Sequence, residues 1–179
     1  MNNREFDRCM RRIQKGDKTG LKEIYEAYIS YIYAVIRGIV KNKENAEDLT
    51  AEFFIKLWNM ADQYKVGSGH KTWMTVIARN MAIDFMRKAG REQLTEEVPE
   101  VSAADTAAGT ADSMENKVVG RMNFRETVEK LPETERQIMT MKLAGQMTFK
   151  EIAEVLGIPM GTVTWKYQNS LEKLRRVGV

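Results

Sequence analysis

The chain has 179 residues, of which 43% are hydrophobic and 30% are charged, with only three prolines and a formal net charge of +3. This composition suits a folded, helical protein of one domain or two small ones. No apolar run approaches the ~20 residues that span a bilayer, the start lacks the apolar segment of a signal peptide, and the single cysteine, Cys9, excludes an internal disulfide. We therefore expect a cytoplasmic protein with no membrane insertion of its own.

Charge is distributed unevenly along the chain. Residues 1–91 carry 17 Lys and Arg against 11 Asp and Glu, residues 92–116 carry none against seven, and residues 117–179 carry 11 against seven. Two basic blocks therefore flank an acidic one. Basic blocks favour nucleic acid as a partner, because neutralisation of phosphates supplies most non-specific affinity.

The first block is predicted to hold three helices before residue 60. Residues 4–14 form a short one, and a longer one follows Gly20, since apolar side chains recur every three and four positions as far as Ile39. Asn42 can cap a third helix with acidic residues in its first turns. Its outward face carries Glu47, Asp48, Glu52, Lys56 and Asn59. This face is either a solvated charged surface, which spacing alone favours, or a docking face for a basic partner.

A loop is predicted between Met60 and Lys71, flexible at Gly67 and Gly69. His70 has no set of partners for metal or nucleophile chemistry, so we predict a surface or core residue there, and no cofactor or metal. The next helix, KTWMTVIARNMAIDFMRK, is expected to bury Trp73, Val76, Ile77, Met81 and Phe85. Its polar stripe consists of Asn80, Asp84, Arg87 and Arg91, joined by Arg79 and Lys88. Asn and Arg read base edges and hold phosphates, but an exposed structural face fits the stripe equally well.

Residues 92–116 lack apolar periodicity and are rich in Ala, Thr, Ser and acid, which predicts a flexible acidic linker between two domains. Beyond it, a helix is expected to end near Leu131, and Pro132 opens another. Apolar residues of that helix should pack beneath the rest of the second domain: Ile138, Met141 and Leu143.

The stretch from Met147 to Arg176 is the most complete motif. Thr148 and Glu151 form a capping box, Gly157 suits a helix end at positive φ, and a second helix starts near Thr162. A short helix, a turn containing glycine and a longer helix are typical of the helix-turn-helix, whose second helix enters the DNA major groove. An ordinary pair of antiparallel helices is the alternative, and we favour DNA binding.

Taken together, these segments resemble bacterial RNA polymerase sigma factors of the sigma-70 family, in the two-domain extracytoplasmic-function group. AEDLTAEFFIKLW is similar to the core-binding helix, KTWMTVIARNMAIDFMRK to the promoter-opening helix, and LPETERQIMTMKLAGQMTFKEIAEVLGIPMGTV to the second domain. The resemblance implies an all-α fold of two small helical domains joined by the acidic linker. Residues 1–91 would be the region 2-like domain and residues 117–179 the region 4-like domain with the helix-turn-helix.

The resemblance also implies roles for particular residues. Core polymerase would bind Asp48, Glu52, Phe53 and Lys56. The minus-ten element, with a captured unstacked base, would meet Tyr64, Lys65, Lys71, Trp73, Arg79, Asn80, Asp84, Arg87 and Lys88. The minus-thirty-five element would meet Thr148, Thr162, Thr164, Trp165, Lys166 and Asn169. The implied partners are core RNA polymerase, promoter DNA and an anti-sigma factor.

The chain departs from the family pattern at several positions. Ala51 stands where Gln is usual, Thr164 and Asn169 stand where basic residues are common, and Trp165 replaces a small residue. Promoter sequence therefore cannot be carried over from other members. The alternative functions are a conventional dimeric helix-turn-helix regulator and an enzyme that uses Asp48 with Glu52 or Asp84. The second is disfavoured because no glycine loop, metal cluster or nucleophile accompanies these carboxylates.

Overall fold

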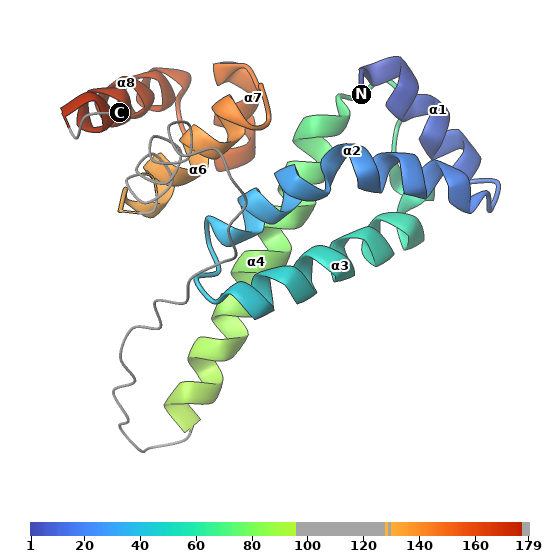
Figure 1. Cartoon of the computed structure of the whole chain (residues 1–179), viewed down its shortest axis with the longest axis horizontal. Coiled ribbons are helices and arrows are strands. Elements are labelled where there is room, and N and C mark those ends of the chain that lie inside the picture. The colour runs from blue at the N-terminus through green and yellow to red at the C-terminus, as the bar shows by residue number, and fades with distance from the viewer. Residues whose placement is uncertain (96–127, 129, 177–179) are drawn as a thin grey trace, which may run out of the picture.

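The computed structural model describes residues 1–95, 128 and 130–176, without the side chains of 92–95, and every regular element in these ranges is helical (Figure 1). The elements are α1 (Asn3–Ile13), α2 (Lys18–Arg37), α3 (Lys43–Asn59), the 3-10 helix η1 (Ala61–Gln63), α4 (His70–Thr95), α6 (Glu133–Leu143), α7 (Phe149–Leu156) and α8 (Met160–Arg176). The predicted all-α class is confirmed for these ranges. None of the described helices has both the length and the apolar composition needed to cross a membrane.

Two predicted segments lie largely outside the described residues: the linker and the helix expected to end near Leu131. The linker prediction was wrong at its start, since residues 92–95 continue α4. Glu92, Gln93 and Leu94 are good helix formers. Gly90 precedes them, but α4 continues through it.

Side-chain caps determine where the first helices begin. Asn2 and Glu5 form a reciprocal capping box at α1, and Asn42 caps α3 as predicted. Asp17 caps α2, which therefore begins before Gly20 rather than after it. Gly20 lies where α1 crosses α2, because a Cβ added there would lie 2.6 Å from the Cys9 carbonyl oxygen.

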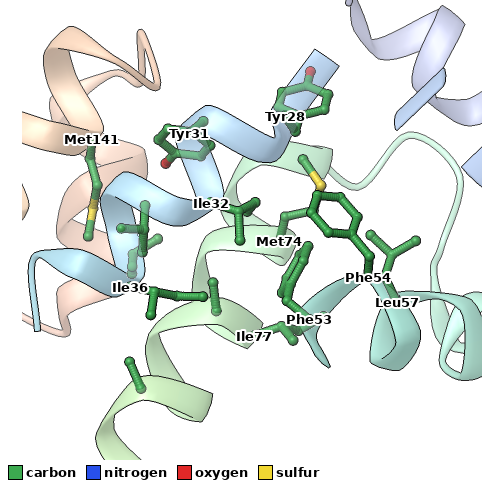
Figure 2. Packing of buried hydrophobic residues seen from close by; sticks show 14 of the residues in the cluster. Tyr28, Tyr31, Ile32, Ile36, Phe53, Phe54, Leu57, Met74, Ile77 and Met141 are labelled. Atoms are coloured by element: carbon green, nitrogen blue, oxygen red, sulfur yellow. The ribbon is translucent and has the colours of Figure 1, made fainter. Parts of the chain in front are cut away.

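The core of the first half surrounds α2, with α1, α3 and α4 packed against it (Figure 1). Ile32 of α2, Phe53 of α3 and Met74 of α4 belong to one buried cluster and lie near one another (Figure 2). The buried stripe of α4 was predicted only in part, as Val76 is exposed and the fully buried positions include Ala78. Small alanine side chains let α4 approach its neighbours closely, so the large residues Trp73, Met81 and Phe85 lie half-buried at the margin.

In the second half, the capping box of Thr148 and Glu151 starts α7, and Gly157 ends it at a φ of 65°, both as predicted. Ile138 and Met141 of α6 are buried beneath α7 and α8, but Leu143 is exposed. Leu143 follows Met141 by two residues, which on a helix turns its side chain to nearly the opposite side.

The two halves are in contact in this structure. Helix α6 packs on α2, and α7 packs on α4. Met141 of α6 and Met147, just after it, belong to the same buried cluster as Tyr31 and Ile36 of α2 (Figure 2).

The crossing of α1 and α2 yields a stability prediction. Gly20→Ala should lower the free energy of unfolding by about 1–3 kcal/mol, because its methyl group would overlap a backbone oxygen. Gly90→Ala is the matched control, since no heavy atom lies within 4 Å of a Cβ there, and it should raise stability by about 0.5–1 kcal/mol. Chemical denaturation followed by circular dichroism measures both; equal effects at the two glycines would contradict the crossing geometry.

Candidate nucleic-acid interface

The middle of α4 presents an exposed polar stripe made of Asn80, Asp84, Arg87 and Lys88. Asp84 and Arg87 form an ion pair at 3.7 Å, but both side chains are about 70% exposed, at 73% and 70% respectively. Such a pair contributes little to stability because water and salt screen it. Arg87 can therefore exchange this pairing for contacts with a polyanion at little energetic cost.

The loop before α4 is held against α1. The Tyr64 hydroxyl donates to Asp7 Oδ1 at 2.7 Å, and the Gly67 backbone N–H lies 3.4 Å from the same oxygen. Burial and the neighbouring carboxylate raise the pKa of the Tyr64 phenol. Gly67 and Gly69 have φ of 84° and 86°, which side-chain-bearing residues rarely adopt. The structure thus places Tyr64 in the core as a support of the loop, away from solvent, while Lys65 is exposed.

His70 forms the base of this loop. Its ring stacks on Phe6 with centroids 4.4 Å apart, and its Nε2 hydrogen-bonds the Tyr28 hydroxyl. The Nδ1 atom has no hydrogen-bond partner among the described residues, and no three metal-ligating side chains gather in that part of the chain. Burial, assisted by Lys71, lowers the pKa of His70 to about 4. The imidazole is therefore neutral near pH 7 and part of the core.

The buried histidine predicts a pH dependence of stability. Between its ordinary pKa of 6.5 and the folded value of about 4, the unfolded chain binds a proton that the folded chain does not. The free energy of unfolding should therefore fall as pH decreases through this window. His70→Gln, which does not titrate there, should show a weaker fall. Urea denaturation at several pH values measures both slopes, and parallel slopes would exclude His70 as the source.

On α3, the exposed residues Asp48, Glu52 and Lys56 share the outer face, whereas Phe53 is fully buried and packs edge-on against Phe54. Phe53 therefore supports this face from below. Sequence reasoning missed Ile55, which is 63% exposed. An isoleucine off the apolar stripe, on an otherwise charged face, was the available signal.

A groove of about 730 Å³ runs between α3 and α4. Its lining includes Glu52, Ile55, Lys56 and Asn59 from α3, and Met81, Asp84, Phe85 and Lys88 from α4. The fold therefore brings one side of the α3 face next to the polar stripe of α4, which spacing within either helix could not indicate.

The residues predicted to contact DNA from α8 differ in their exposure to solvent. Trp165 is 61% exposed, with the Lys166 ammonium 5.9 Å from its ring centroid. Thr162 and Asn169 are half-buried. The Thr164 hydroxyl donates to the Met160 carbonyl oxygen at 3.0 Å, so that hydroxyl is engaged by its own helix. The remaining predicted residue, Thr148, is the N-cap of α7 and its hydroxyl is likewise engaged there.

A buried carboxylate fixes α8 on α6. Glu135 is 5% exposed, and its Oε2 accepts from Ser170 Oγ at 3.1 Å and from Lys173 Nζ at 2.8 Å. The sequence indicated only that Glu135 suits the first turn of α6; the partners on α8 become visible with the tertiary structure. This pairing holds the exposed face of α8 in a fixed orientation.

Arg79, which precedes Asn80 on α4, differs from the residues of the stripe. Its side chain is half-buried, and its Nε donates to Gln137 Oε1 of α6 at 3.0 Å. Lys71 and Trp73, nearer the start of α4, are also half-buried. The structure thus gathers Asn80, Asp84, Arg87 and Lys88 on one open surface and turns Arg79 toward the second half of the chain.

Comparisons with known proteins follow the same division of the chain. Residues 24–92 match Sigma-70 region 2, and residues 121–174 match Sigma-70 region 4. The ECF RNA polymerase sigma factor SigW of Bacillus subtilis (strain 168) is 28% identical over 178 residues, covering 93% of each chain. The ECF RNA polymerase sigma-E factor of Haemophilus influenzae is 26% identical over 160 residues, covering 85% of this chain and 84% of that one.

Solved structures include a similar fold. The sigma factor RpoE, in its co-crystal with the anti-sigma factor NepR from Bartonella quintana, aligns with a TM-score of 0.70. The alignment covers 89% of this chain and 96% of that one at 21% sequence identity. At this identity the likeness concerns the fold.

Proposed function

Because this chain belongs to the sigma-70 family, in the extracytoplasmic-function group, we propose that separate helical surfaces bind core polymerase and each of the two promoter elements. As a sigma factor it directs promoter-specific transcription. One observation carries the proposal: regions 2 and 4 occur in order on one chain, and helices in each present polar side chains to solvent.

Core polymerase binds the outer face of α3. Asp48, Glu52 and Lys56 supply charge that steers association, and Ile55 supplies exposed apolar area at the edge of the groove. Phe53 acts from beneath by fixing the helix on the core. An exposed isoleucine surrounded by charges is typical of a protein interface, in which an apolar centre lies within a polar rim.

The minus-ten element binds α4 and the loop before it. Asn80 offers an amide that can pair with a base edge, and Arg87 and Lys88 offer cations for phosphates. Lys65, Lys71 and Trp73 flank the place where an unstacked base would lie, and Tyr64 holds the loop from behind. A rigid loop suits this task, because unstacking a base costs a few kcal/mol that contacts must offset.

The minus-thirty-five element binds α8. Trp165 is the most available contact, with the Lys166 ammonium near its ring, and Asn169 can read adenine with both amide atoms. Thr162 lies on the same helix nearer its start, where backbone N–H groups favour phosphate. The hydroxyls of Thr148 and Thr164 are hydrogen-bonded within their own helices. Only the other atoms of these side chains are left to contact DNA.

The protein works in the cytoplasm and is a transcription regulator rather than an enzyme. An anti-sigma factor is a further partner, since the similar RpoE structure was solved with one. Run-off transcription with sigma-free core polymerase, from the promoter of the protein's own operon, tests the function. A chain that neither binds core nor initiates, yet binds a palindromic operator tightly as a dimer, would instead be a conventional helix-turn-helix regulator.

The division of labour predicts separable defects. Asn80→Ala should slow promoter opening by roughly tenfold or more through loss of a base contact, with unchanged affinity for core polymerase. Permanganate reactivity of unpaired thymines measures opening, and fluorescence anisotropy measures core binding.

Glu52→Arg should show the reverse order of effects. Reversal of a charge on the α3 face should weaken core binding by about tenfold, and any loss of opening should be recovered at high core concentration. If both variants reduce core affinity equally, α3 and α4 do not have separate partners.

A further inference from the structure

Helix α1 carries a row of arginines on the side turned away from the core. Arg4, Arg8 and Arg11 recur at spacings of four and three residues, so they lie within about 60° of arc around the helix. All three are exposed, and we call them the arginine row. The buried residues of α1 lie on the opposite side of the helix: Phe6, Cys9, Met10 and Ile13.

The arginine row has no counter-charge, unlike other exposed cations of the first half. On α2 and α3, Lys22 pairs with Glu26 and Lys43 with Glu47, each four residues further along its helix. Within the part of the chain that the structure describes, no side chain of the row forms a hydrogen bond or an ion pair. Like charges three and four positions apart repel each other on a helix. The stability of α1 therefore does not explain the row.

The other charged side chains of α1 are engaged within the protein. Glu5 Oε2 accepts from the Asn2 backbone N–H at 2.8 Å, as part of the capping box. The Arg12 guanidinium pairs with Asp17 at 3.0 Å and with Glu23 at 2.6 Å. The arginine row is therefore the charged part of the helix that is left for an outside partner.

Asp7 places the arginine row beside the loop that precedes α4. Asp7 follows Arg4 by three residues and precedes Arg11 by four, so it lies on the flank of the row. Its Oδ1 accepts from the Tyr64 hydroxyl of the loop at 2.7 Å. Figure 1 shows α1 beside the start of α4 and away from α6, α7 and α8. The exposed Lys65, which follows Tyr64, therefore continues the cationic surface along the loop.

We propose that the arginine row holds the sugar-phosphate backbone of promoter DNA next to the minus-ten element. Guanidinium groups suit this role because they stay charged and present several N–H donors in one plane to phosphate oxygens. The row lies before residue 24, where the match to Sigma-70 region 2 begins, and adds a backbone contact to the base-reading residues of α4. This inference rests on the proposed function, because that function brings DNA to the loop.

Two other anionic partners are less suited to the arginine row. A helix that lies on a membrane needs a free apolar face, and that of α1 is buried in the core. An acidic surface of core polymerase would also attract the row, but the surface that we assign to polymerase lies on α3. The loop attached to α1 through Asp7 is instead part of the surface that we assign to DNA.

Neutralisation of the arginine row tests its role in the holoenzyme. Arg4→Gln with Arg11→Gln removes two cations from the row. Lys22→Gln with Lys43→Gln is the matched control, because it removes two cations that form only exposed ion pairs. Affinity of the holoenzyme for the promoter of the protein's own operon is measured over a series of salt concentrations, and affinity for core polymerase is measured by fluorescence anisotropy.

The arginine pair should lower promoter affinity roughly fivefold or more at low salt, with unchanged affinity for core polymerase. It should also reduce the slope of log affinity against log salt concentration by about 1.4–1.8, because each phosphate contact contributes about 0.7–0.9 to that slope. The lysine pair should leave the slope unchanged.

A phosphate scan locates the contact on the DNA. Single methylphosphonate linkages, which carry no negative charge, are placed one at a time in each strand around the minus-ten element. A linkage that lies against the arginine row should weaken binding by the wild-type holoenzyme and have no effect on the Arg4→Gln, Arg11→Gln variant. Identical scan profiles for the two proteins overturn the proposal.

The other outcomes are also decisive. If the arginine pair weakens binding to core polymerase and leaves the salt slope for DNA unchanged, the row binds polymerase and the proposal is wrong. Equal losses for the arginine and lysine pairs also overturn it, because net charge would then matter rather than position.

Failure of the proposed function gives a different result. In that case the wild-type chain does not direct core polymerase to the promoter at all. Affinity of the free chain for a fluorescent DNA duplex at low salt then decides whether the row binds the DNA backbone. A larger loss for the arginine pair than for the lysine pair supports this contact, and equal affinities exclude it.

Discussion

Burial of α2 on several sides is the constraint on which the rest of the structure depends. Ile24, Ile32 and Ile36 are fully buried, and α1, α3 and α4 all pack against this helix. Because the inner faces of α3 and α4 are occupied in this way, their charged faces can only point outward. The apolar stripe of one helix thus orients the polar surfaces of α3 and α4 that we propose bind polymerase and promoter DNA.

The loop before α4 shows how buried groups support a functional surface indirectly. Tyr64 hydrogen-bonds Asp7 of α1, and His70 stacks on Phe6 of α1 and hydrogen-bonds Tyr28 of α2. The loop therefore has a fixed base although its glycines have positive φ angles. Two of the departures from the family pattern lie on the outer surface instead. Ala51 is exposed on α3 beside Glu52, and Trp165 is exposed on α8, so both change what a partner meets without disturbing the core.

Arg79 is a polar residue of α4 that faces the second half of the chain, where its Nε donates to Gln137 Oε1. This contact joins α4 of the first half to α6 of the second half, and the residue that makes it is next to the exposed Asn80 in the sequence.

The sequence by itself determined the helical class, most helix boundaries and the family, because these depend on signals within a few residues. Asn42, the pair of Thr148 and Glu151, and Gly157 act on adjacent backbone groups, so their effects were predictable. Only the tertiary structure decided that Tyr64 is buried, that Val76 is exposed, and that Arg79 meets Gln137. These outcomes depend on which helix faces meet across long sequence separations, and periodicity within one helix carries no information about its neighbours.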